Sequence, residues 1–251
     1  MSLSVDLNAD LGEGARHEEE LLALVTSANI ACGAHAGDAR MMRASLEAAK
    51  ARGVAVGAHP GFHDREHFGR RELAISNREV FDLVADQLRT FEAAAHSVGL
   101  RPQHVKPHGA LYNMAARDEA IADAITRAVR EVDPALLVFA PAASALSRAA
   151  EAHELQVTRE VFADRNYLPD GSLVPRSHPE ALLHDPVEAA NRVFGMLRDD
   201  KVRAIDGTEV TVHADTICVH GDTPDAVRFA IELRTCLAQT GVMIAPPGPS
   251  A

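Results

Sequence analysis

Short runs of apolar residues alternate along the chain with longer segments in which apolar residues recur every three or four positions. The short runs have the length and composition of strands buried on both faces, and the longer segments have the spacing of amphipathic helices. Regular alternation of the two predicts repeated βα units on a parallel sheet, which is an α/β fold. The seven strand candidates are residues 4–8, 27–30, 54–57, 104–106, 137–140, 157–161 and 216–219.

The helical pattern is clearest between residues 77 and 98, where Val84, Leu88 and Phe91 follow the spacing of one helix face. Ser76 and Glu79 have the positions of a capping box, which predicts the start of this helix. Further helices are predicted at residues 17–25, 38–52, 117–131, 142–153 and 186–198, and a last helix is predicted to open at Thr223 and Pro224.

The last third of the chain carries two further signals. Asp206-Gly207 stands between runs of alternating polarity at 202–205 and 209–213, which predicts a β-hairpin inserted before the last strand. The composition has no break, with 47% hydrophobic residues over 251 positions, so we expect a single domain over residues 1–245. The proline-rich residues 246–251 are expected to form a disordered C-terminal tail.

Charge and cysteine content narrow the class of partner. The formal net charge of −11 argues against a nucleic-acid or anionic-membrane partner, because binding phosphates requires a basic surface. A small molecule or another protein is the expected partner.

The three cysteines form no C-x-x-C pair, the N-terminus lacks the features of a signal peptide, and no apolar run is long enough to span a membrane. We therefore expect a cytoplasmic protein.

Polar and titratable side chains gather where the predicted strands end. Four histidines, His35, His59, His108 and His220, each follow a strand candidate and stand beside glycine, proline or aspartate. In a closed βα barrel the C-terminal ends of parallel strands meet on one face. We therefore interpret the domain as a seven-stranded parallel βα barrel in which these histidines share a pocket. Lys106 joins them, because Pro107 ends its strand.

Several of these segments resemble motifs of the LamB/YcsF family. They occur in order between about Leu3 and Ile244, without internal gaps. The segments are VDLNADLGE at 5–13, ANIACGAHAGD at 28–38, VGAHPGF at 56–62, FGRR at 68–71, VKPHGALYN at 105–113, EVFADR at 160–165 and ICVHGDTP at 217–224.

The resemblance implies a fold, a reaction and partners. The fold is an irregular βα barrel related to the glycoside hydrolase and deacetylase superfamily. The reaction is the ATP-dependent opening of 5-oxo-L-proline to L-glutamate, performed with two other subunits, and a homo-oligomer is also possible. ATP with Mg²⁺ is then a co-substrate, and we expect neither a tightly bound cofactor nor a metal ion. Nucleotide binding is inferred only through the family, because the glycines at 12 and 14 do not complete a phosphate-binding motif.

Hydrolysis of a lactam requires an activated carbonyl, a deprotonated water and a protonated leaving nitrogen. We assign Asp10 and His108 as candidate base and acid, with Lys106, His35 and His59 as further catalytic candidates. Expected substrate-binding residues are Asp6, Asn8, Glu160, Arg165, Arg176, His220 and Asp222, of which the arginines suit a carboxylate and the acidic residues orient other groups.

Two alternatives remain open. Asp10, His35 and His59 could bind a divalent metal ion that acidifies water, as in a metal-dependent amidase or deacetylase. The chain could also be a non-catalytic subunit that binds substrate while its partners perform the chemistry.

Overall fold

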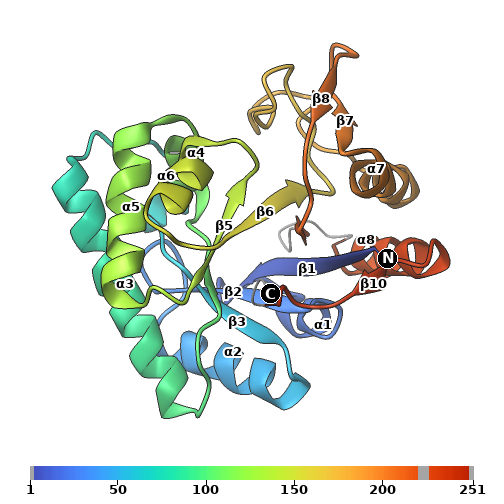
Figure 1. Cartoon of the computed structure of the whole chain (residues 1–251). Coiled ribbons are helices and arrows are strands. Elements are labelled where there is room, and N and C mark those ends of the chain that lie inside the picture. The colour runs from blue at the N-terminus through green and yellow to red at the C-terminus, as the bar shows by residue number, and fades with distance from the viewer. Residues whose placement is uncertain (1–2, 220–225, 249–251) are drawn as a thin grey trace.

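The computed structural model describes residues 3–219 and 226–248, and within them seven parallel strands close into a barrel. The closure comes from pairing of β1 with both β2 and β9, so the predicted seven-stranded parallel barrel is confirmed (Figure 1). The barrel strands are β1 (Ser4–Leu11), β2 (Ser27–Ala31), β3 (Ala55–His59), β4 (His104–Val105), β5 (Leu137–Pro141), β6 (Val157–Phe162) and β9 (Thr216–Cys218).

Helices surround the barrel on the outside (Figure 1). They are α1 (Glu18–Leu22), α2 (Ala39–Arg52), α3 (Asn77–Ser97), α4 (Gly109–Arg117), α5 (Glu119–Val132), α6 (Ala145–Ala152), α7 (Pro186–Asp199) and α8 (Ala226–Gln239), with a 3₁₀ turn at Arg65–His67. The predicted capping box of Ser76 and Glu79 is present at the start of α3. The predicted opening of the last helix at Thr223 and Pro224 lies outside the described residues.

One α-helix and one strand of the structure were not predicted. No helix was expected directly after His108, but α4 forms there, with Leu111 and Ala115 buried at helical spacing. Met243–Ile244 forms a further strand, β10, which pairs with Ser4 and Val5 at the start of β1. A strand of two residues is too short to show a period, so the hydrophobic pattern carries no signal for β10.

The predicted hairpin is confirmed as the antiparallel pair β7 (Lys201–Arg203) and β8 (Glu209–Thr211). It lies beside α7, on the side of the barrel away from α3 and α5 (Figure 1). Of the predicted tail, residues 246–248 are irregular, and the carbonyl of Pro247 accepts a hydrogen bond from Gln103 Nε2 at 2.8 Å. Across the described ranges, no helix has both the length and the hydropathy to cross a bilayer.

Alternation along β1 decides what lies inside the barrel. Leu7 and Ala9 point to one face and belong to the hydrophobic core under the helices. Asp6, Asn8 and Asp10 point to the other face, where Asp6 and Asn8 bond to Thr216 of the neighbouring strand β9 and Asp10 bonds to Lys106 after β4. The interior therefore carries a polar column along β1, while the apolar core lies between barrel and helices.

Candidate active site

An ammonium group occupies the C-terminal end of the barrel interior. Lys106 follows β4 directly, and its Nζ lies 3.0 Å from Asp10 Oδ1 and 2.8 Å from Glu160 Oε1. Asn8 Oδ1 at 3.2 Å and Cys218 Sγ at 3.1 Å complete its surroundings. Burial opposes the charge, but the carboxylates of Asp10 and Glu160 outweigh burial and raise the pKa of Lys106 well above its ordinary value. Lys106 is therefore a permanent cation.

Amides and a phenol satisfy the remaining acceptors around this cation. Asn29 Nδ2 donates to Asn8 Oδ1 at 2.7 Å and to Asp10 Oδ1 at 2.8 Å. The Tyr112 hydroxyl, brought in by α4, donates to Glu160 Oε2 at 2.6 Å. We call these residues the ammonium network: Asn8, Asp10, Asn29, Lys106, Tyr112 and Glu160.

Asp6 lies one layer deeper, at the N-terminal end of the polar column. Its Oδ1 accepts hydrogen bonds from the hydroxyls of Thr26 at 2.6 Å and Ser27 at 2.8 Å, and its Oδ2 accepts one from Thr216. Burial nevertheless dominates and raises the pKa of Asp6 from 3.8 to about 6. The structure thus places Asp6 among structural hydroxyls at the deep end of the column.

His104 supports the network from β4 without touching the charge. Its Nε2 donates to Asn29 Oδ1 at 2.7 Å, and its ring stacks on Phe139 with centroids 4.1 Å apart. Burial lowers the pKa of His104 to about 3, so the ring is neutral. Only glycine fits opposite it, because a Cβ on Gly57 would lie 2.2 Å from His104 Cδ2.

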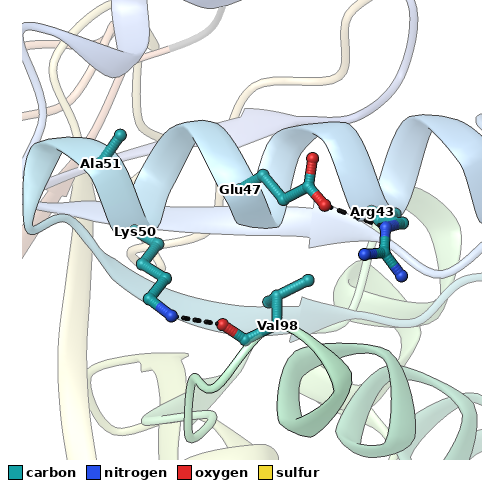
Figure 2. A pocket seen from close by; sticks show the side chains of 5 residues that line it. All are labelled: Arg43, Glu47, Lys50, Ala51 and Val98. Carbon is teal, nitrogen blue, oxygen red and sulfur yellow. Dashed lines mark hydrogen bonds and ion pairs between the residues drawn. The ribbon is translucent and has the colours of Figure 1, made fainter.

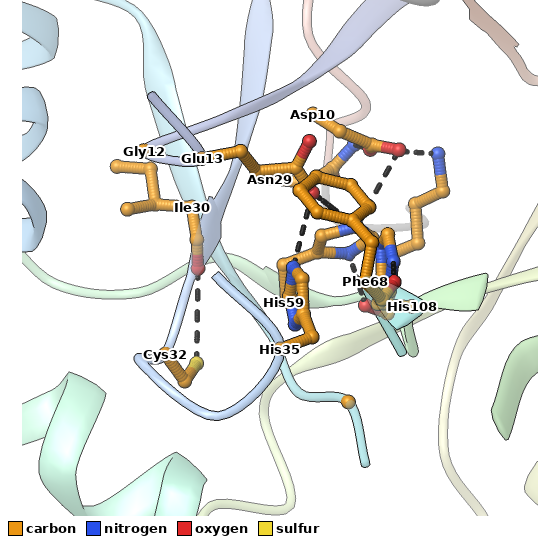
Figure 3. A network of polar contacts seen from close by, with 12 residues as sticks. Asp10, Gly12, Glu13, Asn29, Ile30, Cys32, His35, His59, Phe68 and His108 are labelled. Carbon is orange, nitrogen blue, oxygen red and sulfur yellow. Dashed lines mark hydrogen bonds and ion pairs between the residues drawn. The ribbon is translucent and has the colours of Figure 1, made fainter. Parts of the chain in front are cut away.

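Three imidazoles and a carboxylate converge beside the ammonium network, at the ends of β1 to β4 (Figure 3). Glu13 Oε1 lies 3.0 Å from His35 Nε2, 3.8 Å from His59 Nε2 and 3.4 Å from His108 Nδ1. His59 Nε2 and His108 Nδ1 are 2.9 Å apart. We call Glu13, His35, His59 and His108 the imidazole cluster. The three histidines are buried, and the four side chains offer ligand atoms within 4.8 Å of one another.

Main-chain carbonyls fix the orientation of two of these rings. His59 Nδ1 lies 2.7 Å from the carbonyl oxygen of Lys106, and His108 Nε2 lies 2.9 Å from that of Phe68. A carbonyl oxygen only accepts, so each of these nitrogens carries the hydrogen and donates it. The nitrogens that face the cluster, His59 Nε2 and His108 Nδ1, are then bare lone pairs in the neutral rings.

The imidazole cluster is held in place by a close approach of the backbone at Gly61 and by a loop whose amides bind the Glu18 carboxylate. A Cβ on Gly61 would lie 2.7 Å from His35 Nδ1, so the chain there can approach only as glycine. The loop that carries Glu13 is fixed by the Glu18 carboxylate, which accepts hydrogen bonds of 2.8 to 3.0 Å from the amides of residues 12 to 15. These amides therefore bind a carboxylate of the chain itself. Phe68 covers the cluster, with its ring edge-on to His35 and His108 (Figure 3).

Asp10 joins the two groups of residues. Its Oδ1 belongs to the ammonium network, while its Oδ2 lies 3.4 Å from His59 Nε2. Burial lowers the pKa of His108 well below its usual range, and the neighbouring rings of His59 and His35 lower it further. For His59 burial also opposes the charge, but the Asp10 carboxylate outweighs it and raises the pKa of His59. A proton entering this pair therefore resides on His59.

The structure brings together most of the predicted site residues. Asn8, Asp10, Lys106 and Glu160 share the ammonium network, and His35, His59 and His108 share the imidazole cluster.

Two arginines lie in the loop after β6. Arg165 is buried and donates to the carbonyls of Val174 at 2.6 Å and Ala181 at 3.4 Å, so its guanidinium holds this loop together. Arg176 lies exposed in the same loop. His220 and Asp222, both predicted substrate-binding residues, lie outside the described residues.

Four residues of the site were expected neither as catalytic nor as substrate-binding residues. Glu13, Asn29 and Tyr112 stand within the family motifs but had no predicted role, and His104 was predicted only as part of a strand. Alternation was the available signal, since His104 and Lys106 occupy the same face of one strand.

A surface hollow of about 470 Å³ lies elsewhere, between α2 and the end of α3 (Figure 2). Its lining consists of exposed helix residues, including the Arg43–Glu47 ion pair and the Lys50 ammonium, which donates to the Val98 carbonyl at 2.6 Å. These groups satisfy one another at the surface. The hollow therefore has the chemistry of a solvated helix face, and the buried clusters are the stronger candidate.

The fold and site define a parallel βα barrel with buried titratable groups at the C-terminal ends of its strands. The model of the LamB/YcsF family matches residues 5–250, and the chain belongs to this family. It is 49% identical over 248 residues to a 5-oxoprolinase subunit from Geobacillus kaustophilus, with 97% of each chain covered.

Solved structures agree with this placement. The lactam utilization protein of Thermus thermophilus superposes with a TM-score of 0.90 at 44% identity, covering 97% of this chain and 99% of that one. The catalytic domain of a peptidoglycan N-acetylglucosamine deacetylase from Eubacterium rectale gives a TM-score of 0.57 at 10% identity, covering 100% of this chain and 91% of that one. This second likeness concerns the fold alone, and it agrees with the expected deacetylase-like barrel.

Proposed function

We propose that this chain is a subunit of an ATP-dependent 5-oxoprolinase, which opens 5-oxo-L-proline to L-glutamate with two partner subunits. The name of the Geobacillus kaustophilus relative supports the substrate and the existence of partners, and the lactam utilization protein points to the same class of cyclic amide. The observation that carries the proposal is the position of Asp10 between the Lys106 ammonium and the His59 imidazole.

In this proposal Asp10 is the general base. Its side chain is 14% exposed, in contrast to the fully enclosed Glu160, so water can reach it. The Lys106 ammonium, 3.0 Å from Asp10 Oδ1, fixes the orientation of this carboxyl group, which makes Lys106 a positioning residue. Asp10 removes a proton from water, the water oxygen bonds to the carbonyl carbon, and the ring C–N bond breaks. The proton that Asp10 has taken from the water passes to the leaving nitrogen, so that the amine departs and the carboxylate of Asp10 is restored.

The ATP-dependent step is assigned to the partner subunits. Helix starts and glycine-rich loops bind phosphate through free amides. The amides of residues 12 to 15 already hold the Glu18 carboxylate, so this loop is closed to a phosphate group. We expect the partners to transfer the γ-phosphoryl group of ATP to the lactam oxygen with the help of Mg²⁺. Water addition and C–N cleavage in this barrel then leave an acyl phosphate, which a second water hydrolyses to the carboxylate of glutamate and inorganic phosphate.

The test is a reconstitution assay with an Asp10 variant. Glutamate formation from 5-oxoproline should require this chain, both partners, ATP and Mg²⁺ together, and Asp10→Asn should lower the rate by about 10² to 10⁴ because the base is lost. Asp86→Asn, on the exposed face of α3, is the matched control and should keep the wild-type rate. Wild-type turnover by Asp10→Asn, or glutamate production by the isolated chain, would contradict the proposal.

Substrate binding separates catalysis from a pure binding role. If Asp10 is the base, calorimetry should give Asp10→Asn a wild-type affinity for 5-oxoproline in the assembled complex. If the chain only binds substrate, the affinity and the rate should fall together.

A further inference from the structure

Two lone pairs face each other in the imidazole cluster. The carbonyls of Lys106 and Phe68 each hold one ring hydrogen, so His59 Nε2 and His108 Nδ1 meet at 2.9 Å as acceptors. Neither nitrogen can donate to the other while both rings are neutral. Glu13 Oε1, a third acceptor, lies 3.4 Å from His108 Nδ1. A cation between them would turn this repulsion into attraction.

The cluster also has the outer contacts that a metal site requires. Histidines that bind metals generally donate their second ring hydrogen to a carbonyl or carboxylate, which fixes the ring and aims the free nitrogen at the ion. His59 and His108 both do so, from different strands and to carbonyls of different loops. A surface histidine needs no such constraint, and the constraint appears here on two rings that point at one place.

The spacing of the donor atoms agrees with one small ion. In a tetrahedral site with bonds of about 2.0 to 2.1 Å, neighbouring ligand atoms lie about 3.3 to 3.4 Å apart. Glu13 Oε1 lies 3.8 Å from His59 Nε2 and 3.4 Å from His108 Nδ1, these two nitrogens are 2.9 Å apart, and their rings are nearly perpendicular. The His35 ring is stacked on His108, so an ion in the plane of one ring cannot lie in the plane of the other, and His35 Nε2 instead contacts Glu13 Oε1 at 3.0 Å. Two imidazoles with one carboxylate suit Zn²⁺ and related transition metals better than Mg²⁺ or Ca²⁺.

We propose that Glu13, His59 and His108 form a binding site for one divalent transition-metal ion, with Zn²⁺ as its reference ligand and with His35 holding the Glu13 carboxylate. This set differs from the Asp10, His35 and His59 combination that sequence alone offers, because Asp10 Oδ1 is engaged by Lys106 and Asn29. A bound ion would supply Lewis acidity next to Asp10. The proposed site belongs to the isolated chain and does not depend on the proposed reaction.

Metal content and Co²⁺ spectroscopy test the site directly. The tag-free full chain, stripped with chelator and dialysed, should take up about one Zn²⁺ per chain at micromolar concentration and show a higher Tm. Co²⁺ should give visible absorption bands of a site with nitrogen ligands, which Zn²⁺ then displaces. His59→Gln and His108→Gln should each lose stoichiometric binding, whereas His96→Gln, on the exposed face of α3, should bind like wild type.

The rival occupant is a proton shared between His59 and His108. In that case the wild-type chain takes up well below one Zn²⁺, its Tm does not respond to Zn²⁺ or Co²⁺, and nitrogen NMR detects an imidazolium at neutral pH. That result would overturn the metal site even if the variants fail to fold, because it is obtained on the wild-type chain. Unchanged metal uptake by folded His59→Gln and His108→Gln would overturn it equally. Neither outcome alters the reconstitution assay.

Discussion

Lys106 and His108 stand two residues apart after β4, yet the side chains around them accommodate burial in different ways. The Lys106 ammonium has three hydrogens and is surrounded by acceptors, which in turn receive hydrogens from Asn29 and Tyr112. Around His108 the acceptors meet one another, and the ring hydrogens point outward to main-chain carbonyls. The first group balances donors against acceptors, and the second has more acceptors than hydrogens.

This contrast separates stability from ligand binding. A complete buried network is strongly destabilised when one partner is removed, because charges are left without compensation. A cluster with surplus acceptors tolerates the loss of one ring better, since each loss also relieves repulsion. We therefore expect the ammonium network to dominate stability and the imidazole cluster to dominate ligand binding.

The largest effect should come from removing the ammonium. Lys106→Met leaves the carboxylates of Asp10 and Glu160 facing each other in the barrel, and we expect the free energy of unfolding to fall by about 3 to 5 kcal/mol. Urea denaturation followed by circular dichroism measures this change. The double variant Lys106→Met with Glu160→Gln should recover part of the loss, because one of the two uncompensated carboxylates is removed. Equal stabilities of the single and double variants would show that the charges are not coupled.

The second effect is a dependence of the free energy of unfolding on pH, which arises from Asp6 at the deep end of the polar column. The pKa of Asp6 is about 6 in the folded chain and 3.8 as the reference for the unfolded chain, so the folded state holds the proton more tightly. Stability therefore falls as pH rises from about 4 to about 6 and levels off above. At about 1.4 kcal/mol for each pH unit, the total is about 3 kcal/mol.

Comparison with Asp6→Asn isolates this contribution. The variant cannot ionise, so the difference in unfolding free energy between it and wild type should change by about that amount between pH 4 and pH 7. Urea titrations at several pH values provide the measurement. A difference that is independent of pH would mean that Asp6 titrates near its ordinary value.

The smallest of the three effects tests packing between the network and its support. In Gly57→Ala the new Cβ would lie 2.2 Å from His104 Cδ2, so the ring must shift away from Asn29, and we expect a loss of about 1 to 3 kcal/mol. Gly195→Ala in α7 is the control, because its Cβ meets nothing within 4 Å. Alanine should there raise stability by about 0.5 to 1 kcal/mol. A destabilised control with an unaffected Gly57→Ala would contradict this account of the packing.

Much of the fold followed from the sequence because buried parallel strands are short apolar runs. Such runs predicted the seven barrel strands, including β4, which has only two paired residues. The helix α4 was not predicted because it has only nine residues and begins at Gly109, a residue that favours a turn.

The site was predictable in its membership more than in its contacts. Convergence of strand ends in a barrel was enough to group Asp10, His59 and Lys106. The pattern of polar and apolar residues does not specify which ring nitrogen donates to a main-chain carbonyl, because that depends on the path of loops such as the one ending at Phe68. For the same reason, the return of the loop after β6 onto Arg165 could not be read from the sequence.

The position of β1 has a mechanical consequence. Along this strand, Ser4 and Val5 pair with β10, Asp6 to Asn8 pair with β9, and Asn8 to Leu11 pair with β2. The same strand carries Asp6, Asn8 and Asp10 as alternate residues, so β1 fixes the positions of all three layers of the polar column. A displacement of Asp10 must break its pairing with Asn29 of β2, and it would pull on Asn8, which pairs with both β2 and β9. The carboxylate therefore keeps its alignment whether or not a substrate is present, and adjustment to a substrate falls to the loops at the barrel mouth.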